Sequence, residues 1–89
     1  MRAILTVVGK DTVGIMAKVS HLCAKYNVNI VDVNQTVMQD LFCMIMLCEI
    51  DKIESDFNSF SDSALELGQN DNLSIHVMHE DIFNSMHKI

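Results

Sequence analysis

The loop at residues 9–15 is the segment of this chain whose residue types could do chemistry. It runs Gly-Lys-Asp-Thr-Val-Gly-Ile, directly before an expected helix. Gly14 lets another group approach the backbone closely, and the free N–H groups at a helix start suit a carboxylate. A simpler structure fits the same residues, with Asp11 or Thr12 capping the helix and Gly14 packing against a sheet. The spacing alone leaves both interpretations open.

The four histidines and three cysteines show no spacing that is typical of a metal site. Cys43 and Cys48 are five residues apart on an expected strand, so they should face opposite sides of it. No serine or cysteine stands beside an evident base, and no oxyanion-binding set accompanies one. We therefore predict no metal, no cofactor and no catalytic residue, and we do not expect an enzyme.

Two amphipathic helices and four strands must position the loop. The apolar patterns predict strand, helix, strand, strand, helix, strand and helix at residues 3–8, 15–26, 28–38, 41–50, 53–67, 73–78 and 80–89. The first strand is apolar enough to be buried on both faces. A turn at residues 38–41 makes a hairpin of the second and third strands. Asn27 and Gly68 are the expected helix terminators.

This order predicts an α+β fold, a ferredoxin-like βαββαβ sandwich. It has a four-stranded antiparallel sheet with two helices on one face, plus a short C-terminal helix. The strands at 3–8 and 41–50 are nearly all apolar, which is typical of central strands. The other two contain polar residues, as edge strands require.

Charge and length restrict the partners of this chain. Its 89 residues predict one domain, and six basic residues against a net charge of −6 exclude the basic stripe that nucleic acid needs. The longest apolar run has eight residues, far short of the roughly 20 that span a membrane. We expect a cytoplasmic protein with no signal peptide and with reduced thiols. The seven methionines favour core filling, although the apolar hairpin could also be a dimer surface.

The loop at 9–15, the helix after it and the segment Asn27–Ile30 (Asn-Val-Asn-Ile) resemble the signature of ACT domains. The segment Asp32–Thr36 (Asp-Val-Asn-Gln-Thr) is also similar. The resemblance covers residues 2–78 and is closest to small stand-alone bacterial ACT proteins. It extends to the ACT modules of the glycine-cleavage regulator and of formyltetrahydrofolate deformylase. It implies an ACT domain at 1–78 with a helical extension at 79–89.

The resemblance implies an effector held between two domains. The first loop would contribute Asp11 and Gly14, and the start of the second strand in the partner would contribute Asn29. Their separation, 29 − 11 = 18 residues, matches that of serine-sensing members. Two residues depart from the family pattern. Val13 replaces a proline, and Asp11 replaces an asparagine, so the loop would repel a ligand carboxylate and attract an ammonium group.

We therefore predict a regulatory homodimer that senses a small-molecule amino acid at its interface. The expected ligand-binding residues are Asp11, Thr12, Val13, Gly14, Ile15, Asn29 and Ile30. The alternative is a protein-interaction subunit without a ligand, which docks on an enzyme or a regulator. Side-by-side sheets and face-to-face packing both remain open as dimer geometries.

Overall fold

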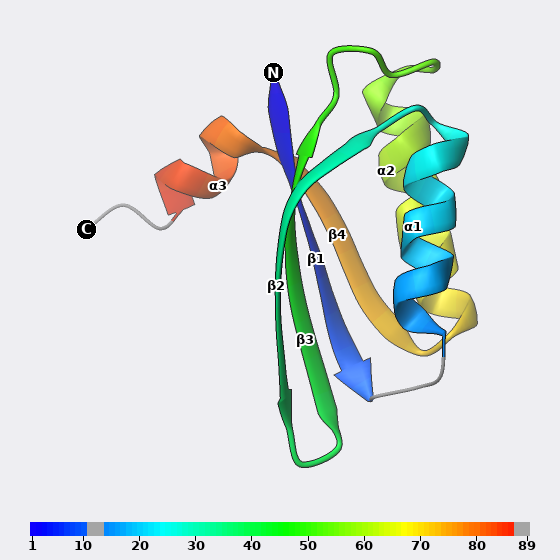
Figure 1. Cartoon of the computed structure of the whole chain (residues 1–89), viewed down its shortest axis with the longest axis vertical. Helices are drawn as coiled ribbons and strands as arrows, with labels where there is room; N and C mark the ends of the chain where they lie inside the picture. Colours follow the sequence, from blue (N-terminus) through cyan, green and yellow to red (C-terminus); the bar gives the residue numbers. More distant parts are fainter. Residues whose placement is uncertain (11–13, 87–89) are drawn as a thin grey trace.

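The computed structural model describes residues 1–10 and 14–86 (Figure 1). Its elements are β1 (Arg2–Lys10), α1 (Ile15–Lys25), β2 (Asn29–Met38), β3 (Leu41–Glu49), α2 (Phe57–Asn70), β4 (Leu73–His79) and α3 (Glu80–Met86). The order confirms the predicted βαββαβ arrangement with a short helix after it. Figure 1 shows α1 and α2 side by side on one face of the sheet, with α3 on the other side.

The four strands form one antiparallel sheet in the order β2-β3-β1-β4. The apolar strands β1 and β3 are central and the more polar β2 and β4 are edges, as predicted. The hairpin is also confirmed, with Met38 opposite Leu41 across a two-residue turn. Gln39 has a φ of 58° and so supplies the left-handed residue that a glycine would otherwise provide.

The core lies between the sheet and the two helices. Leu5, Met44, Met46 and Phe60 are among its fully buried side chains. The position of Met44 and Met46 confirms that these methionines fill the core. Met38, at the hairpin turn, is 60% exposed instead.

The opposite face of the sheet has no complete covering layer, so the prediction that the first strand is buried on both faces is wrong. Val8 points to this face and is 42% exposed. Ile4 lies on the same face and is buried, near the end of the sheet where α3 contacts β1 and β4. We call this surface, away from α1 and α2, the open face.

Gly14 and Asn27 flank α1. The N-cap is Gly14, with a φ of 87° and no side-chain cap hydrogen bond. Only glycine adopts such a φ without steric cost. The expected capping residues Asp11 and Thr12 lie outside the described residues. At the other end, Asn27 has a φ of 58° and donates its backbone N–H to Ala24 O at 3.1 Å. Its expected role in ending the helix is confirmed.

The second helix begins and ends later than predicted. Asp56 caps it by accepting from the Ser59 N–H at 2.7 Å, so residues 53–56 lie before the helix although Ile53 continues its apolar pattern. Gly68 does not end the helix. It is buried within α2, and the left-handed residue after the helix is Asn72, with a φ of 58°. The small size of Gly68 serves the packing of α2 on β4 instead.

Candidate functional site

The first half of the predicted site lies at the N-terminus of α1. Gly14 is exposed there, and a Cβ built on it would meet no atom within 4 Å. Its carbonyl accepts from the Lys18 N–H at 3.0 Å, which closes the first helical turn. The Ile15 side chain is buried in the core, so only its backbone faces this end of the helix. The predicted ligand residues Asp11, Thr12 and Val13 lie outside the described residues.

The second half of the predicted site lies at the opposite end of the sheet. Asn29 begins β2, opposite Glu49, and Glu49 is also opposite Arg2 at the start of β1. The loop that leads to Gly14 follows Lys10 at the far end of β1. Eight strand residues separate these levels, which is about 26 Å. One chain therefore cannot bring Asn29 and Gly14 into contact with the same small ligand.

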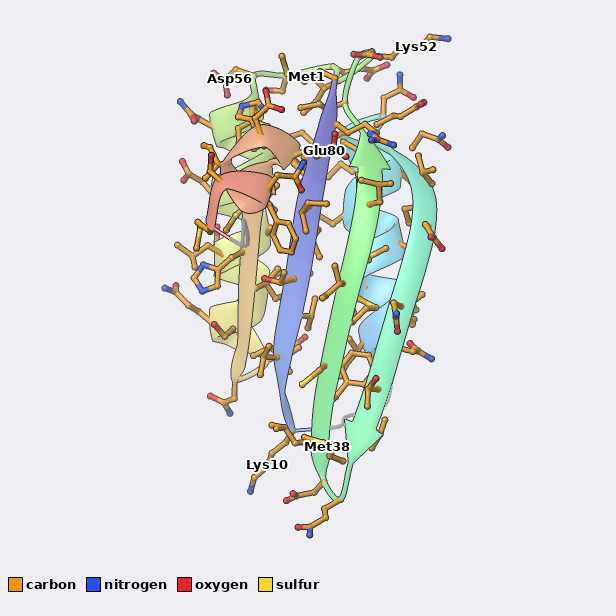
Figure 2. The ribbon with its side chains drawn as sticks, turned by 90° about the vertical axis from the view of Figure 1, so that its left-hand side faces the viewer. Met1, Lys10, Met38, Lys52, Asp56 and Glu80 are labelled. Atoms are coloured by element: carbon orange, nitrogen blue, oxygen red, sulfur yellow. The ribbon has the colours of Figure 1, made fainter. Side chains whose placement is uncertain are left out.

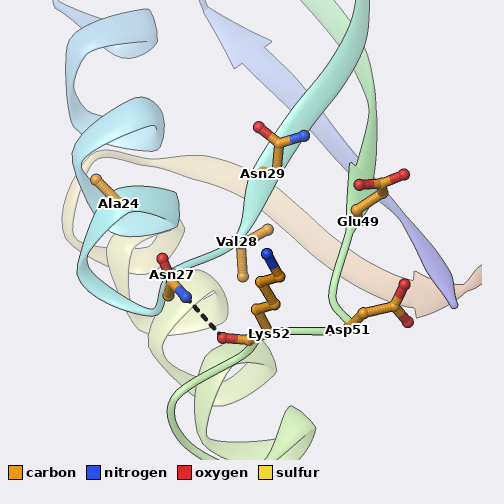
Figure 3. Close-up of a pocket in the computed structure, with 7 residues that line it drawn as sticks. All are labelled: Ala24, Asn27, Val28, Asn29, Glu49, Asp51 and Lys52. Carbon is orange, nitrogen blue, oxygen red and sulfur yellow. Dashed lines mark hydrogen bonds between the residues drawn. The ribbon is translucent and has the colours of Figure 1, made fainter.

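Asn29 lines a hollow of about 420 Å³ at the end of the sheet where β2 begins. The residues around it are Ala24, Asn27, Val28, Asn29, Glu49, Asp51 and Lys52 (Figure 3). Ile30, the other predicted strand residue, is half-buried against the core. A hollow of this size can hold a small amino acid.

Hydrogen bonds brace the loop that carries Lys52 against the end of α1. The Asn27 side-chain amide donates to Lys52 O at 2.8 Å, and the Glu54 N–H donates to Tyr26 O at 3.1 Å. The left-handed conformation of Asn27 turns its side chain toward this loop. Figure 3 shows the Lys52 side chain extending from the loop toward the start of β2.

Charges of both signs surround the hollow. Asp51 accepts from the N-terminal ammonium of Met1. Among residues 1–10 and 14–86, no ion pair includes Glu49 or Lys52. An amide, an ammonium and a carboxylate therefore line one hollow. Sequence reasoning identified Asn29 but missed Glu49 and Lys52, because the β2–β3 register brings Glu49 beside it and the loop after β3 brings Lys52 to the same hollow.

The cysteines do not form a reactive centre in the described part of the chain. Cys23 and Cys48 are buried next to each other in the core, and Cys43 is half-buried on the open face. Cys43 and Cys48 therefore face opposite sides of β3, as predicted. The hydrogen bond with Cys48 and burial both raise the pKa of the Cys23 thiol, which keeps it protonated. Within residues 1–10 and 14–86, no three metal-ligating side chains gather.

The fold and its βαββαβ order define the class of protein. An ACT domain model matches residues 2–78, and this chain belongs to the ACT domain family. ACT domains are regulatory, ligand-binding modules and not catalytic ones. None of the helices at residues 14–86 has the length and apolar character needed to cross a membrane.

Several relatives are similar over nearly their whole length. A UPF0237 protein of Listeria monocytogenes is 47% identical over 89 residues, which is all of both chains. A UPF0237 protein of Methanococcus maripaludis is 48% identical over 86 residues, or 97% of this chain and 96% of that one.

Solved structures of ACT domains share the fold. An ACT domain protein from Streptococcus pneumoniae has a TM-score of 0.80 and 38% identity over 93% of both chains. A putative glycine cleavage system transcriptional repressor has a TM-score of 0.70 and 25% identity, over 86% of this chain and 44% of that one. This likeness confirms the resemblance from which the site was predicted.

Proposed function

We propose that this protein is a regulatory module that binds a free amino acid between two copies of the chain, joined along β2. One observation carries the proposal: Gly14 and Asn29 lie at opposite ends of the side of the molecule formed by α1 and β2. Antiparallel pairing of two β2 strands about a two-fold axis brings Asn29 of one copy beside the first loop of the other. Two equivalent sites result.

The edge strand β2 is suited to such pairing. Asp32 is its one charged residue among ten, and the outer backbone groups of an edge strand have no partner within the sheet. Exposed Val31 and Val37 add apolar surface along the strand.

The ligand would meet both parts of the site at once. The first loop contributes Asp11, Thr12, Val13, Gly14 and the backbone of Ile15, and β2 contributes Asn29 and Ile30. Asp11 attracts the ammonium group of the ligand, and Lys52 attracts its carboxylate. The Asn29 amide can donate to one group and accept from the other. This arrangement favours a small amino acid with an uncharged side chain.

Regulation follows from where the ligand lies. An amino acid that contacts both copies binds the paired form more tightly than the separate one, and this difference sets how far it can shift the equilibrium. The paired form would then present a different surface to whatever the module controls.

A thermal-shift screen of the full chain against the twenty amino acids tests the proposal. A ligand at a hundredfold excess over its dissociation constant stabilises the folded state by about 2.7 kcal/mol, or about 10 °C or more in Tm. Asn29→Ala should abolish the shift. Asn58→Ala, at an exposed position of α2 outside the hollow and away from β2, is the matched control and should keep it.

The screen also separates the proposal from its competitor. Equal loss in Asn29→Ala and Asn58→Ala would mean that the hollow is not the site. A flat screen for the unmodified chain would refute amino-acid sensing.

A protein-interaction subunit without a ligand is the second candidate. The exposed Ile82 and Met86 on α3 favour it, because they offer apolar surface to a partner. A flat screen, together with a stoichiometric complex that Ile82→Glu abolishes, would support this function.

We also propose how the chain divides into domains, where it works and which partners it lacks. Residues 1–78 act as the ACT domain and residues 79–89 as the predicted helical extension, of which residues 87–89 lie outside the described residues. The module works in the cytoplasm without a cofactor or catalysis. Its net charge of −6 argues against nucleic acid and anionic membrane surfaces as partners.

A further inference from the structure

Asn27 ends α1 in a backbone conformation that glycine usually adopts. Its φ is 58°, and its N–H donates to Ala24 O at 3.1 Å. The next N–H, from Val28, donates to Cys23 O at 2.8 Å. These two bonds make a Schellman motif, in which glycine is the commonest residue at the left-handed position. An asparagine there keeps a side-chain amide that glycine lacks, and the helix end holds that amide in one place.

The Asn27 amide holds one peptide group of the loop after β3. Ile50, Asp51, Lys52 and Ile53 form a turn, which the Ile53 N–H closes by donating to Ile50 O at 3.3 Å. The Lys52 carbonyl belongs to the same peptide group as that N–H, and it accepts from Asn27 Nδ2 at 2.8 Å (Figure 3). Both polar groups of this peptide unit are therefore bonded. Removal of the Asn27 amide leaves only the longer bond within the turn.

Both ends of the turn are anchored, so its orientation decides where the Lys52 side chain points. Ile50 is buried, Ile53 packs against the core, and the Ile50 N–H donates to Met1 O at 3.1 Å. Figure 2 shows Lys52 at the same end of the molecule as Met1. Its side chain extends toward the start of β2, where Asn29 lines the hollow (Figure 3). Within residues 1–10 and 14–86, no ion pair holds the Lys52 ammonium.

We propose that Asn27 is a positioning residue: it holds the turn so that the Lys52 ammonium faces the hollow, and the site thereby selects ligands that carry a free carboxylate. This inference rests on the proposed function, in which Lys52 attracts the carboxylate of an amino acid. A lysine side chain loses rotamer freedom when its ammonium binds. A backbone that is already fixed leaves less to be ordered at that moment, and preorganisation of this kind favours binding.

The ligand class that this arrangement selects is the free amino acid, as opposed to its amide or to a peptide that extends from its carboxyl end. A carboxylate and an ammonium form a charge-assisted hydrogen bond, whereas the uncharged carbonyl of an amide forms a weaker one. Asn27 therefore acts on one part of the ligand, through Lys52. Contacts of the ligand ammonium and side chain do not depend on it.

Isothermal titration of the full chain tests the proposal. The probes are whichever of the twenty amino acids raises Tm most and the C-terminal amide of the same amino acid. A buffer of about pH 6 keeps the α-amino groups of both compounds protonated. Lys52→Met should weaken amino-acid binding about 10–100-fold and leave amide binding nearly unchanged. Asn27→Gly should weaken amino-acid binding about 3–10-fold, again with little effect on the amide.

A matched control separates the brace from the helix end. Glycine fits the left-handed position, so Asn27→Gly keeps the end of α1, and thermal melting shows whether the fold is retained. Asn72 also has a φ of 58°, is exposed after α2 and lies outside the hollow. Asn72→Gly therefore changes the same residue type in the same conformation, and it should bind both compounds as the unmodified chain does.

A double-mutant cycle distinguishes positioning from direct contact with the ligand. In a Lys52→Met chain no ammonium remains to be positioned, so the addition of Asn27→Gly should not weaken amino-acid binding further. An equal loss in both backgrounds would mean that the Asn27 amide contacts the ligand itself, and it would overturn the positioning role.

Two other results overturn the inference and leave the proposed function intact. Asn27→Gly could bind the amino acid as tightly as the unmodified chain, or it could lose affinity equally for the amino acid and its amide. An unmodified chain that binds none of the twenty amino acids overturns both the inference and the proposed function.

Discussion

Replacing Gly68 by alanine sets the helix propensity of one residue against the packing of α2 on β4. In an exposed helix interior, Gly→Ala stabilises by about 1 kcal/mol. Here, a Cβ on Gly68 would lie 2.6 Å from Leu73 O and 3.0 Å from Ile75 Cγ1. The first neighbour is backbone in a sheet strand, so the whole helix must move away. Overpacking of this kind costs about 1–3 kcal/mol, and the backbone contact places this site near the upper end.

The steric cost should exceed the gain in propensity, and Gly68→Ala should destabilise the fold by about 1–2 kcal/mol. For a domain of this length, the expected fall in Tm is about 5–15 °C. Urea unfolding followed by circular dichroism measures the difference. Glu66→Gly compared with Glu66→Ala, at an exposed position of the same helix, gives the propensity term by itself. If Gly68→Ala is as stabilising as that pair predicts, the close packing of α2 on β4 is refuted.

Two further perturbations test local contacts. The hydrogen bonds from Ser59, side chain and backbone, lower the pKa of Asp56. The stabilisation by this cap is therefore present above the pKa of the unfolded chain and is lost as pH falls through the folded value. Asp56→Ala should lower the urea midpoint at pH 7 and differ little from wild type well below pH 4, whereas Asp56→Asn should keep the cap. An equal deficit for Asp56→Ala at both pH values would contradict this. Tyr26→Phe removes the 2.5 Å hydrogen bond between Tyr26 Oη and Ser63 Oγ and should cost about 1 kcal/mol. Combination with Ser63→Ala in a double-mutant cycle measures the coupling, and strictly additive effects would show that the bond contributes nothing.

Only part of the candidate site could be predicted from residues close together in sequence. The asparagine after the first helix follows the local rules of helix ends, and Asn27 lies where those rules place it. Gly14 is exposed at the N-cap of α1, whereas the simpler interpretation of the loop had it pack against the sheet, and Asn29 was predicted from the resemblance to ACT domains. Glu49 and Lys52 could not be found in this way, because they are 20 or more residues from Asn29 and reach it only through the β2–β3 register and the loop after β3.

The helix boundaries show where local pattern fails. Ile53 continues the apolar spacing of the second helix, yet it packs from a loop, because the side chain of Asp56 supplies the cap that starts α2. Glycine is a common helix terminator, but Gly68 lies within α2. There, its lack of a side chain lets the helix pack closely on β4. In both cases the residue type fits two local roles, and only tertiary contacts decide between them.

The sequence by itself determined the order of the elements and which strands are central, because apolar periodicity records how many faces of each strand are buried. Which face of β1 stays open, and that Gly14 and Asn29 lie at opposite ends of one side, were decided only by the tertiary structure. The physical reason is that strand direction and register place residues in space, and neither is encoded in the spacing of residues along one segment.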